Sequence, residues 1–149
     1  MEEKSLEDRI SELKSDESYT NISEVPDYYK NAIIAIEDHR FYRHFGVDVI
    51  ATSRAMLNNI VSFKMQGGGS SITQQVAKNL CFTQEKTLTR KAAELFVVFR
   101  LEKDYEKDEI LELYINNMYF GNGYYNIHDA AEGYYDKLPS ELDLYEATL

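Results

Sequence analysis

The chain has 149 residues, enough for one domain with a single hydrophobic core. Its formal net charge of −10 argues against nucleic acid as a partner, because phosphate binding needs a cationic surface. One cysteine excludes an intrachain disulfide, and no apolar run reaches the ~18 residues that span a bilayer or forms the core of a signal peptide. Any membrane anchor is therefore expected outside this chain.

Residues 1–22 are a polar N-terminal segment, in which Leu6, Ile10 and Leu13 recur at helical spacing and predict a weak helix. The segment ends in a loop rich in serine, aspartate, threonine and asparagine. Residues 23–149 are assigned to one globular domain.

Three helices are predicted in the first half of this domain. One follows Pro26, because its apolar residues return at helical intervals. Asp48 is the expected N-cap of the next helix, and the glycines at 67–69 end it. Ser71 and Gln74 form a capping-box pair that opens the third helix.

A long helix is expected to begin at Thr87 or Thr89. Its inward-facing side chains are predicted to be Leu88, Ala92, Leu95 and Phe99. Shorter helices are predicted over residues 108–118 and 127–134, and Pro139 introduces a last helix that runs to Leu149. Since strand signals are almost absent, the sequence predicts an all-α fold.

The segment 37–48 is the first candidate site. It gathers carboxylates, imidazoles and guanidinium groups directly after a buried apolar run, which suggests proton transfer. Glu37 lies near a helix C-terminus, where the helix dipole and Asp38 disfavour its negative charge, whereas three cationic side chains favour it: His39, Arg40 and Arg43. The alternative interpretation is a surface helix end with ordinary salt bridges.

A metal site is a second interpretation of this segment. His39 and His44 could bind a metal ion together with Asp38 and Asp48. Their spacing matches no H-E-x-x-H arrangement, so a role in orienting loops and side chains is favoured.

The glycine-rich segment leads into Ser70–Gln75 at a helix N-terminus, where unpaired backbone N–H groups favour an anion. It is not a P-loop, and a plain connector is the alternative. Gln74, Gln75 and Lys78 share the polar side of this helix.

A basic cluster, Lys86, Arg90 and Lys91, interrupts the acidic chain and is followed by Glu94. These cations suit a phosphate group. The alternative is a surface pair between Arg90 and Glu94, worth a few tenths of a kcal/mol.

The order of these segments resembles the five motifs of glycosyltransferase family 51, the peptidoglycan glycosyltransferases. The first is Glu37-Asp38-x-x-Phe41-x-x-His44-x-Gly46-Val47-Asp48, and the second runs from Gly68 through Gln75 to Lys78-Asn79. Arg90-Lys91-x-x-Glu94 with Leu101-Glu102 is similar to the third motif. The fourth and fifth are matched by Lys107-x-x-Ile110-Leu111-Glu112-x-Tyr114-x-Asn116 and by Tyr119-Phe120-Gly121 through Ala130-Ala131 and Tyr134-Tyr135.

The chain departs from the family pattern at three positions and at its end. Ser71 replaces the usual threonine, Val98 an alanine, and Asn126 a glycine. None of these changes removes a charged group. The family domain continues beyond a helix that resembles residues 143–147, so this chain is expected to be a C-terminally shortened domain.

The resemblance implies a lysozyme-like, two-lobed helical fold and the polymerisation of lipid II into glycan strands. Glu37 would be the general base on the acceptor 4-hydroxyl, with undecaprenyl pyrophosphate as leaving group, and Glu94 would order the donor site. The implied substrate-binding residues are Ser70, Thr73, Gln74, Gln75, Lys78, Lys86, Arg90 and Lys91. The implied structural supports are Asp38, Phe41, His44, Gly46, Asp48 and Asn116.

The implied partners are lipid II, the nascent glycan chain, the membrane surface and inhibitors of the moenomycin type. A divalent cation such as Mg²⁺ near Glu94 is implied as an aid, with no organic cofactor. The implied location is the outer face of the bacterial cytoplasmic membrane.

Two rival functions remain open at this point. A lysozyme-like hydrolase or lytic transglycosylase would protonate a glycosidic oxygen and has no reason to keep a basic cluster beside its second carboxylate. The second rival function is that of a truncated, non-catalytic module that binds lipid II. The intact Glu37 and Glu94 count against it.

Overall fold

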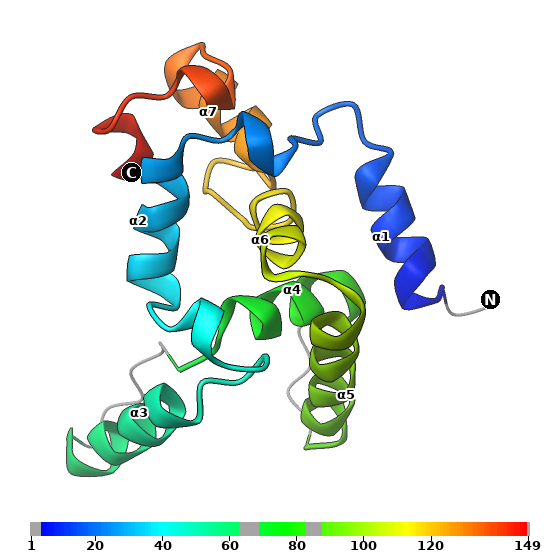
Figure 1. The fold of residues 1–149 in the computed structure, drawn as a ribbon, viewed down its shortest axis with the longest axis vertical. Coiled ribbons are helices and arrows are strands. Elements are labelled where there is room, and N and C mark those ends of the chain that lie inside the picture. The colour runs from blue at the N-terminus through cyan, green and yellow to red at the C-terminus, as the bar shows by residue number, and fades with distance from the viewer. Residues whose placement is uncertain (1–3, 63–68, 83–87, 149) are drawn as a thin grey trace.

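A computed structural model describes residues 4–62, 69–82 and 88–148 (Figure 1). Its helices are α1 (Leu6–Lys14), α2 (Asp27–Glu37), α3 (Val49–Ser62), α4 (Ile72–Cys81), α5 (Leu88–Asp104), α6 (Lys107–Ile115) and α7 (Ile127–Tyr135). Short 3₁₀ turns are η1 (Ile22–Glu24), η2 (Phe41–Arg43), η3 (Pro139–Glu141) and η4 (Glu146–Thr148). The described residues contain no strand, only an isolated bridge between Gly121 and Tyr124. The prediction of an all-α fold is confirmed.

Helix α6 is the centre of the core, and α4 packs on it and on α5 (Figure 1). Five of the nine α6 side chains are apolar and almost fully buried, namely Ile110, Leu111, Leu113, Tyr114 and Ile115. They meet Ile72 and Val76 of α4 and Val98 and Leu101 of α5 in one cluster. Each such side chain contributes roughly 1.5–3 kcal/mol by burial.

The N-terminal segment is fastened to this core. Leu6 and Ile10 of α1 are buried, and α1 packs on α4. Asn116 and Thr20 exchange two hydrogen bonds of 2.8 Å, from the Thr20 N–H to Asn116 Oδ1 and from Asn116 Nδ2 to the Thr20 carbonyl. Glu112 accepts from the Tyr19 hydroxyl at 2.7 Å. These bonds satisfy polar groups that would otherwise be buried without partners.

The capping predictions agree with the structure. Ser71 Oγ accepts from the Gln74 N–H, and Gln74 returns a bond to the Ser71 N–H, so the capping box opens α4. Asp48 Oδ1 accepts from the N–H groups of Ile50 and Ala51, which is the geometry of an N-cap for α3.

The predicted inward face of α5 is wrong for Phe99 and Ala92, which are exposed; Leu95 is partly buried. The buried stripe consists of Glu94, Val98 and Leu101, at i, i+4 and i+7. A carboxylate on the inner stripe cannot be deduced from apolar periodicity. The side chain of Leu88 lies outside the described residues.

The predicted last helix is also wrong. The chain forms the two separate turns η3 and η4, because Leu142 between them is extended. Asp143 Oδ1 then accepts from the N–H groups of Tyr145 and Glu146 and starts the second turn. Leu149 lies outside the described residues.

Candidate active site

Glu37 is the last residue of α2, and its carboxylate is exposed. Its Oε2 accepts a hydrogen bond of 2.9 Å from Gln75 Nε2 in α4. The end of one helix and the first turns of another therefore hold a carboxylate that remains accessible to a substrate.

Tyr114 of α6 lies in the field of this carboxylate. Burial, and then the charge of Glu37, raise the pKa of the Tyr114 hydroxyl, which stays protonated. Residues from α2, α4 and α6 thus converge at one point. The sequence analysis assigned no role to Tyr114, although it is the only aromatic side chain on a helix that is otherwise aliphatic and charged.

Asp38 fixes the chain directly after Glu37. His44 Nε2 lies 2.9 Å from both Asp38 oxygens, and the Ile72 N–H donates to Asp38 Oδ2 at 3.1 Å. Asp38 is 6 % exposed, so these charge-assisted bonds are shielded from water. They tie the end of α2 to the start of α4.

The turn that follows is held by Gly46 and Asp48. Gly46 has φ of +79°, and a Cβ there would lie 2.4 Å from Val98 Cγ1. The Ser71 hydroxyl donates to the Gly46 carbonyl. Burial acts to raise the pKa of Asp48, but bonds from the Ala51 and Ile50 N–H groups and the charge of Arg40 outweigh it and leave that pKa below its usual value.

Three predicted residues lie in the interior beneath this turn. Phe41 is fully buried, with Lys107 Nζ 4.6 Å from its ring centroid. Thr73 is fully buried and donates to Glu102 Oε1 at 2.5 Å, and Lys107 Nζ lies 2.8 Å from the same carboxylate. Gln74 is 6 % exposed and belongs to the capping box. The structure thus places Thr73 and Gln74 in helix packing.

The outer side of α4 carries the accessible polar groups. Ser70 and Lys78 are exposed, and Gln75 is partly buried. Lys78 lies one turn after Gln75, so a cation and the amide that holds Glu37 share a face.

On α5, Glu94 is 3 % exposed and Lys91 Nζ lies 2.5 Å from its Oε1. Glu94 therefore pairs with Lys91, whereas the surface pair considered in the sequence analysis joined Glu94 to Arg90. Arg90 is partly buried. Lys86, the remaining member of the basic cluster, lies outside the described residues.

Metal-binding side chains gather elsewhere in the described part of the chain. Asp38, His44 and Asp48 each offer one ligand atom, all within 4.8 Å of one another. Glu94 does not belong to a group of three such residues there. His39 is exposed and outside this group.

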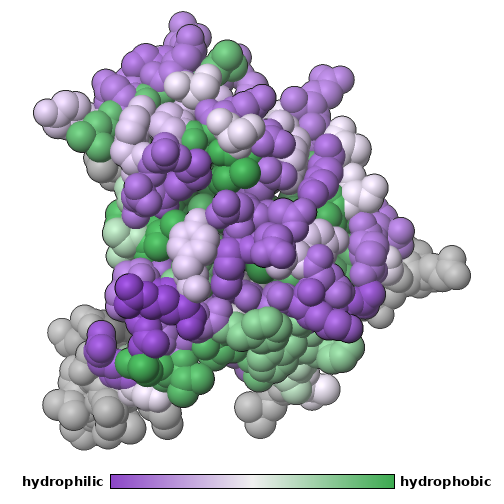
Figure 2. All heavy atoms as spheres, in the orientation of Figure 1, coloured by the Kyte–Doolittle hydropathy of each residue, from purple (hydrophilic) through white to green (hydrophobic). Residues whose placement is uncertain are grey.

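An apolar surface flanks the first turn of α3. Phe45 stacks on Phe99 of α5 with ring centroids 6.2 Å apart, and both are about half exposed. Val49, Ile50 and Phe96 are also exposed. Figure 2 shows green atoms along the lower edge, between α3 and α5. No helix in the described residues is long and apolar enough to cross a bilayer.

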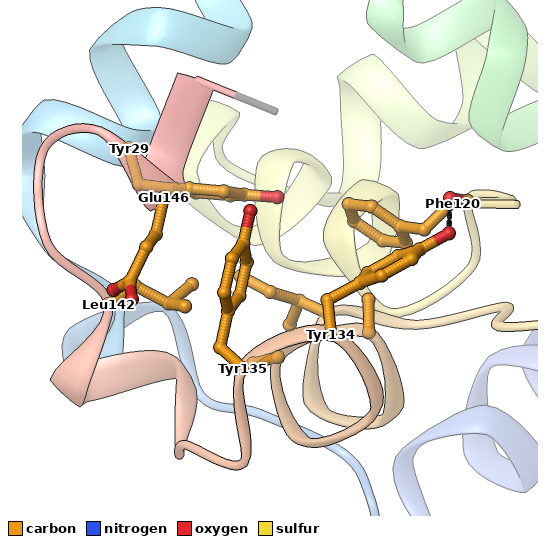
Figure 3. Close-up of a pocket in the computed structure, with 9 residues that line it drawn as sticks. Tyr29, Phe120, Tyr134, Tyr135, Leu142 and Glu146 are labelled. Atoms are coloured by element: carbon orange, nitrogen blue, oxygen red, sulfur yellow. Dashed lines mark hydrogen bonds between the residues drawn. The ribbon is translucent and has the colours of Figure 1, made fainter.

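A pocket of about 240 Å³ lies between α2, α7 and the C-terminal turns (Figure 3). Its wall includes Tyr29, Phe120, Tyr134, Tyr135, Leu142 and Glu146. The Tyr134 hydroxyl donates to the Phe120 carbonyl at 3.0 Å. None of the predicted catalytic or binding residues lines this pocket, and the sequence analysis did not foresee it.

Relatives with curated names cover most of this chain. Penicillin-binding protein 1A of Neisseria gonorrhoeae is 47% identical over 131 residues, which are 88% of this chain and 16% of that protein. The monofunctional glycosyltransferase of Staphylococcus saprophyticus is 47% identical over 128 residues, which are 86% of this chain and 47% of that protein. The corresponding Staphylococcus aureus protein is 45% identical over 128 residues, with the same coverage.

The chain thus spans less than half the length of these relatives. The family model described as transglycosylase matches residues 4–149, from the start of the described residues through the predicted motifs. The chain belongs to the transglycosylase family.

Proposed function

We propose that this chain is a peptidoglycan glycosyltransferase domain that polymerises lipid II. The observation that carries the proposal is the exposed carboxylate of Glu37, held at 2.9 Å by Gln75 and set on a buried framework. Membership of the transglycosylase family and the similarity to a monofunctional glycosyltransferase support the reaction class.

Glu37 would act as the general base. It would take the proton of the acceptor 4-hydroxyl as that oxygen attacks the anomeric carbon of the donor sugar. The bond from the anomeric carbon to the pyrophosphate oxygen breaks, and undecaprenyl pyrophosphate leaves with the electron pair. A general base of this kind contributes typically 10²–10⁴-fold to the rate.

The leaving group needs charge neutralisation more than protonation. Lys78, Arg90 and Lys91 would supply it, together with Lys86, and Ser70 would lie at the N-terminal end of α4. Lys91 would leave Glu94, or share it, as the phosphate binds. Mg²⁺ near Glu94 would supply further positive charge at the pyrophosphate.

The lipid carrier of the substrate requires a membrane surface. The exposed side chains of Phe45, Phe99 and their apolar neighbours would rest on it, at the outer face of the bacterial cytoplasmic membrane.

The test is incubation of the chain with lipid II and Mg²⁺, followed by separation of the glycan products. Wild-type protein should form polymer, and Glu37→Gln should lower the rate by about 10²-fold or more. Glu132→Gln, at an exposed glutamate of α7, is the matched control and should keep the wild-type rate.

Two outcomes would overturn the proposal. Cleavage of preformed glycan without polymer would identify a hydrolase or lytic transglycosylase. Binding of lipid II without turnover in a folded wild-type chain would identify a non-catalytic module.

The cationic site has a separate test. Arg90→Ala combined with Lys91→Ala should weaken binding of a moenomycin-type phosphoglycolipid by about tenfold or more, since charge-assisted bonds to phosphate are lost. Lys103→Ala, at an exposed lysine near the end of α5, is the control. Equal affinity of the folded double variant and wild type would remove these cations from the donor site.

A further inference from the structure

The buried polar cluster behind Glu37 contains two atoms that its own hydrogen bonds do not explain. His44 Nδ1 and Asp48 Oδ2 are buried and have no hydrogen-bond partner in the described structure. The His44 and Asp48 side chains are 6% and 5% exposed. Polar atoms at such depth are normally paired, and the two side chains that carry these atoms belong to one group with Asp38.

The tautomer of His44 follows from its contact with Asp38. Metal ions bind the neutral imidazole, and in that form Nε2, 2.9 Å from both Asp38 oxygens, is the nitrogen placed to donate its proton to the carboxylate. Nδ1 is then left with a lone pair. A histidine that donates one ring N–H to a carboxylate and offers the other nitrogen is the usual arrangement of a metal-binding imidazole.

The two carboxylate oxygens of Asp48 also differ in their hydrogen bonding. Its Oδ1 caps α3 by accepting from the N–H groups of Ile50 and Ala51, whereas its Oδ2 accepts no hydrogen bond. Arg40 Nε forms an ion pair with Oδ2 at 3.6 Å, which is too distant for a hydrogen bond. Oδ2 is therefore available as an anionic ligand.

We propose that His44 and Asp48 bind a zinc-type divalent metal ion, with Asp38 as the carboxylate that orients the imidazole. Ligand atoms of the three residues lie within 4.8 Å of one another. Zinc bonds of about 2.0–2.2 Å place two ligands at most ~4.4 Å apart, so side-chain movements would bring the ligand atoms into bonding range. Water would complete the coordination.

The donor set decides which metal fits. An imidazole nitrogen with a carboxylate suits Zn²⁺ or Co²⁺, whereas Mg²⁺ prefers oxygen ligands and keeps its waters. This site is distinct from any Mg²⁺ at the pyrophosphate. It would stabilise the turn 38–48, and does not depend on the proposed glycosyl transfer.

The three histidines of the chain supply the variants for a test. Chelator-treated protein is titrated with Zn²⁺ by calorimetry and with Co²⁺ by visible absorption. Wild type should bind one equivalent, and His44→Gln should bind at least tenfold more weakly. His39→Gln and His128→Gln should match wild type, because neither residue belongs to the cluster.

Two further variants keep the proposal falsifiable if His44→Gln folds poorly. Asp48→Asn retains a good N-cap for α3 but loses the anionic ligand, and should also weaken Zn²⁺ binding at least tenfold. Arg40→Gln removes a cation that competes for Asp48 and should strengthen Zn²⁺ binding. In Asp38→Asn the carboxylate that orients the imidazole is lost, and the Zn²⁺ affinity should fall by about 10–100-fold.

Failure of wild type to bind Zn²⁺ would overturn the proposal. Equal Zn²⁺ affinity in wild type and folded Asp48→Asn would do the same, as would loss of binding in His39→Gln instead. The unfolding temperature gives an independent readout, since a given Zn²⁺ concentration should raise it more in wild type than in Asp48→Asn.

Discussion

Glu37 Oε2 and Gln75 Nε2 are 2.9 Å apart although 38 residues separate them in the chain. The amide donates a hydrogen bond to that carboxylate, and it comes from a helix whose first turn is fixed by a capping box. The position of the carboxylate therefore depends on how α4 begins.

Gln75→Ala should lower the polymerisation rate by about tenfold or more, because a hydrogen bond to a charged group is worth roughly 1.5–3 kcal/mol. The effect should fall on kcat more than on KM if the bond from Gln75 to Glu37 is what positions the base. Steady-state kinetics on lipid II measure the two. Glu132→Ala, at an exposed residue of α7, is the control. An unchanged kcat would show that the bond is incidental.

Gly46→Ala should destabilise the fold by about 2 kcal/mol or more. The substitution combines the strain of φ +79° with a Cβ placed 2.4 Å from Val98 Cγ1. Gly123→Ala separates the two causes, because Gly123 has φ +87° and nothing within 4 Å of its Cβ position. Urea unfolding gives both free energies. Equal losses in the two variants would mean that the contact with Val98 relaxes without cost.

Cys81, the single cysteine, should react slowly with iodoacetamide at neutral pH. Burial raises the pKa of its thiol above the ordinary 9.0, so little thiolate is present. The rate should rise with pH and reach its midpoint above about pH 9. Because the nearby Arg9 lowers this pKa and Glu7 raises it, Arg9→Gln should slow the reaction and Glu7→Gln should speed it. The same rate in all three proteins would contradict the packing of α1 on α4.

Phe45→Ser combined with Phe99→Ser should reduce binding to vesicles of bacterial phospholipids by about tenfold or more, since two exposed rings of roughly 1.5 kcal/mol each are removed. Sedimentation with the vesicles measures the bound fraction. Tyr145→Ser, at an exposed aromatic near the C-terminal turns, is the comparison variant. If it lost as much binding as the double variant, the apolar surface would not be the contact.

Features set by residues close together in the sequence were predicted correctly. Features that depend on packing between distant residues were not. The capping box of Ser71 and Gln74 spans four residues, so its geometry was available from spacing alone. Phe99 lies outside the buried stripe of α5 and stacks on Phe45, a contact between distant parts of the chain that no periodicity contains.

The candidate site shows the same division. Motif order singled out Glu37 and Gln75, but not the bond between them. The burial of Thr73 results from Glu102, 29 residues further along. Of the two histidines considered for metal binding, only His44 turned inward, because the turn η2 carries it back to Asp38.

The hydroxyl of Ser71 has a single proton, and that proton is given to the Gly46 carbonyl, while an oxygen lone pair receives the Gln74 N–H. Threonine carries the same hydroxyl on the same carbon, so exchange between the two residues preserves both bonds. The serine at this position therefore makes the two hydrogen bonds that the hydroxyl of a threonine would also make. Surveys that search for functional relatives of this chain should require a hydroxyl at position 71 and not threonine in particular.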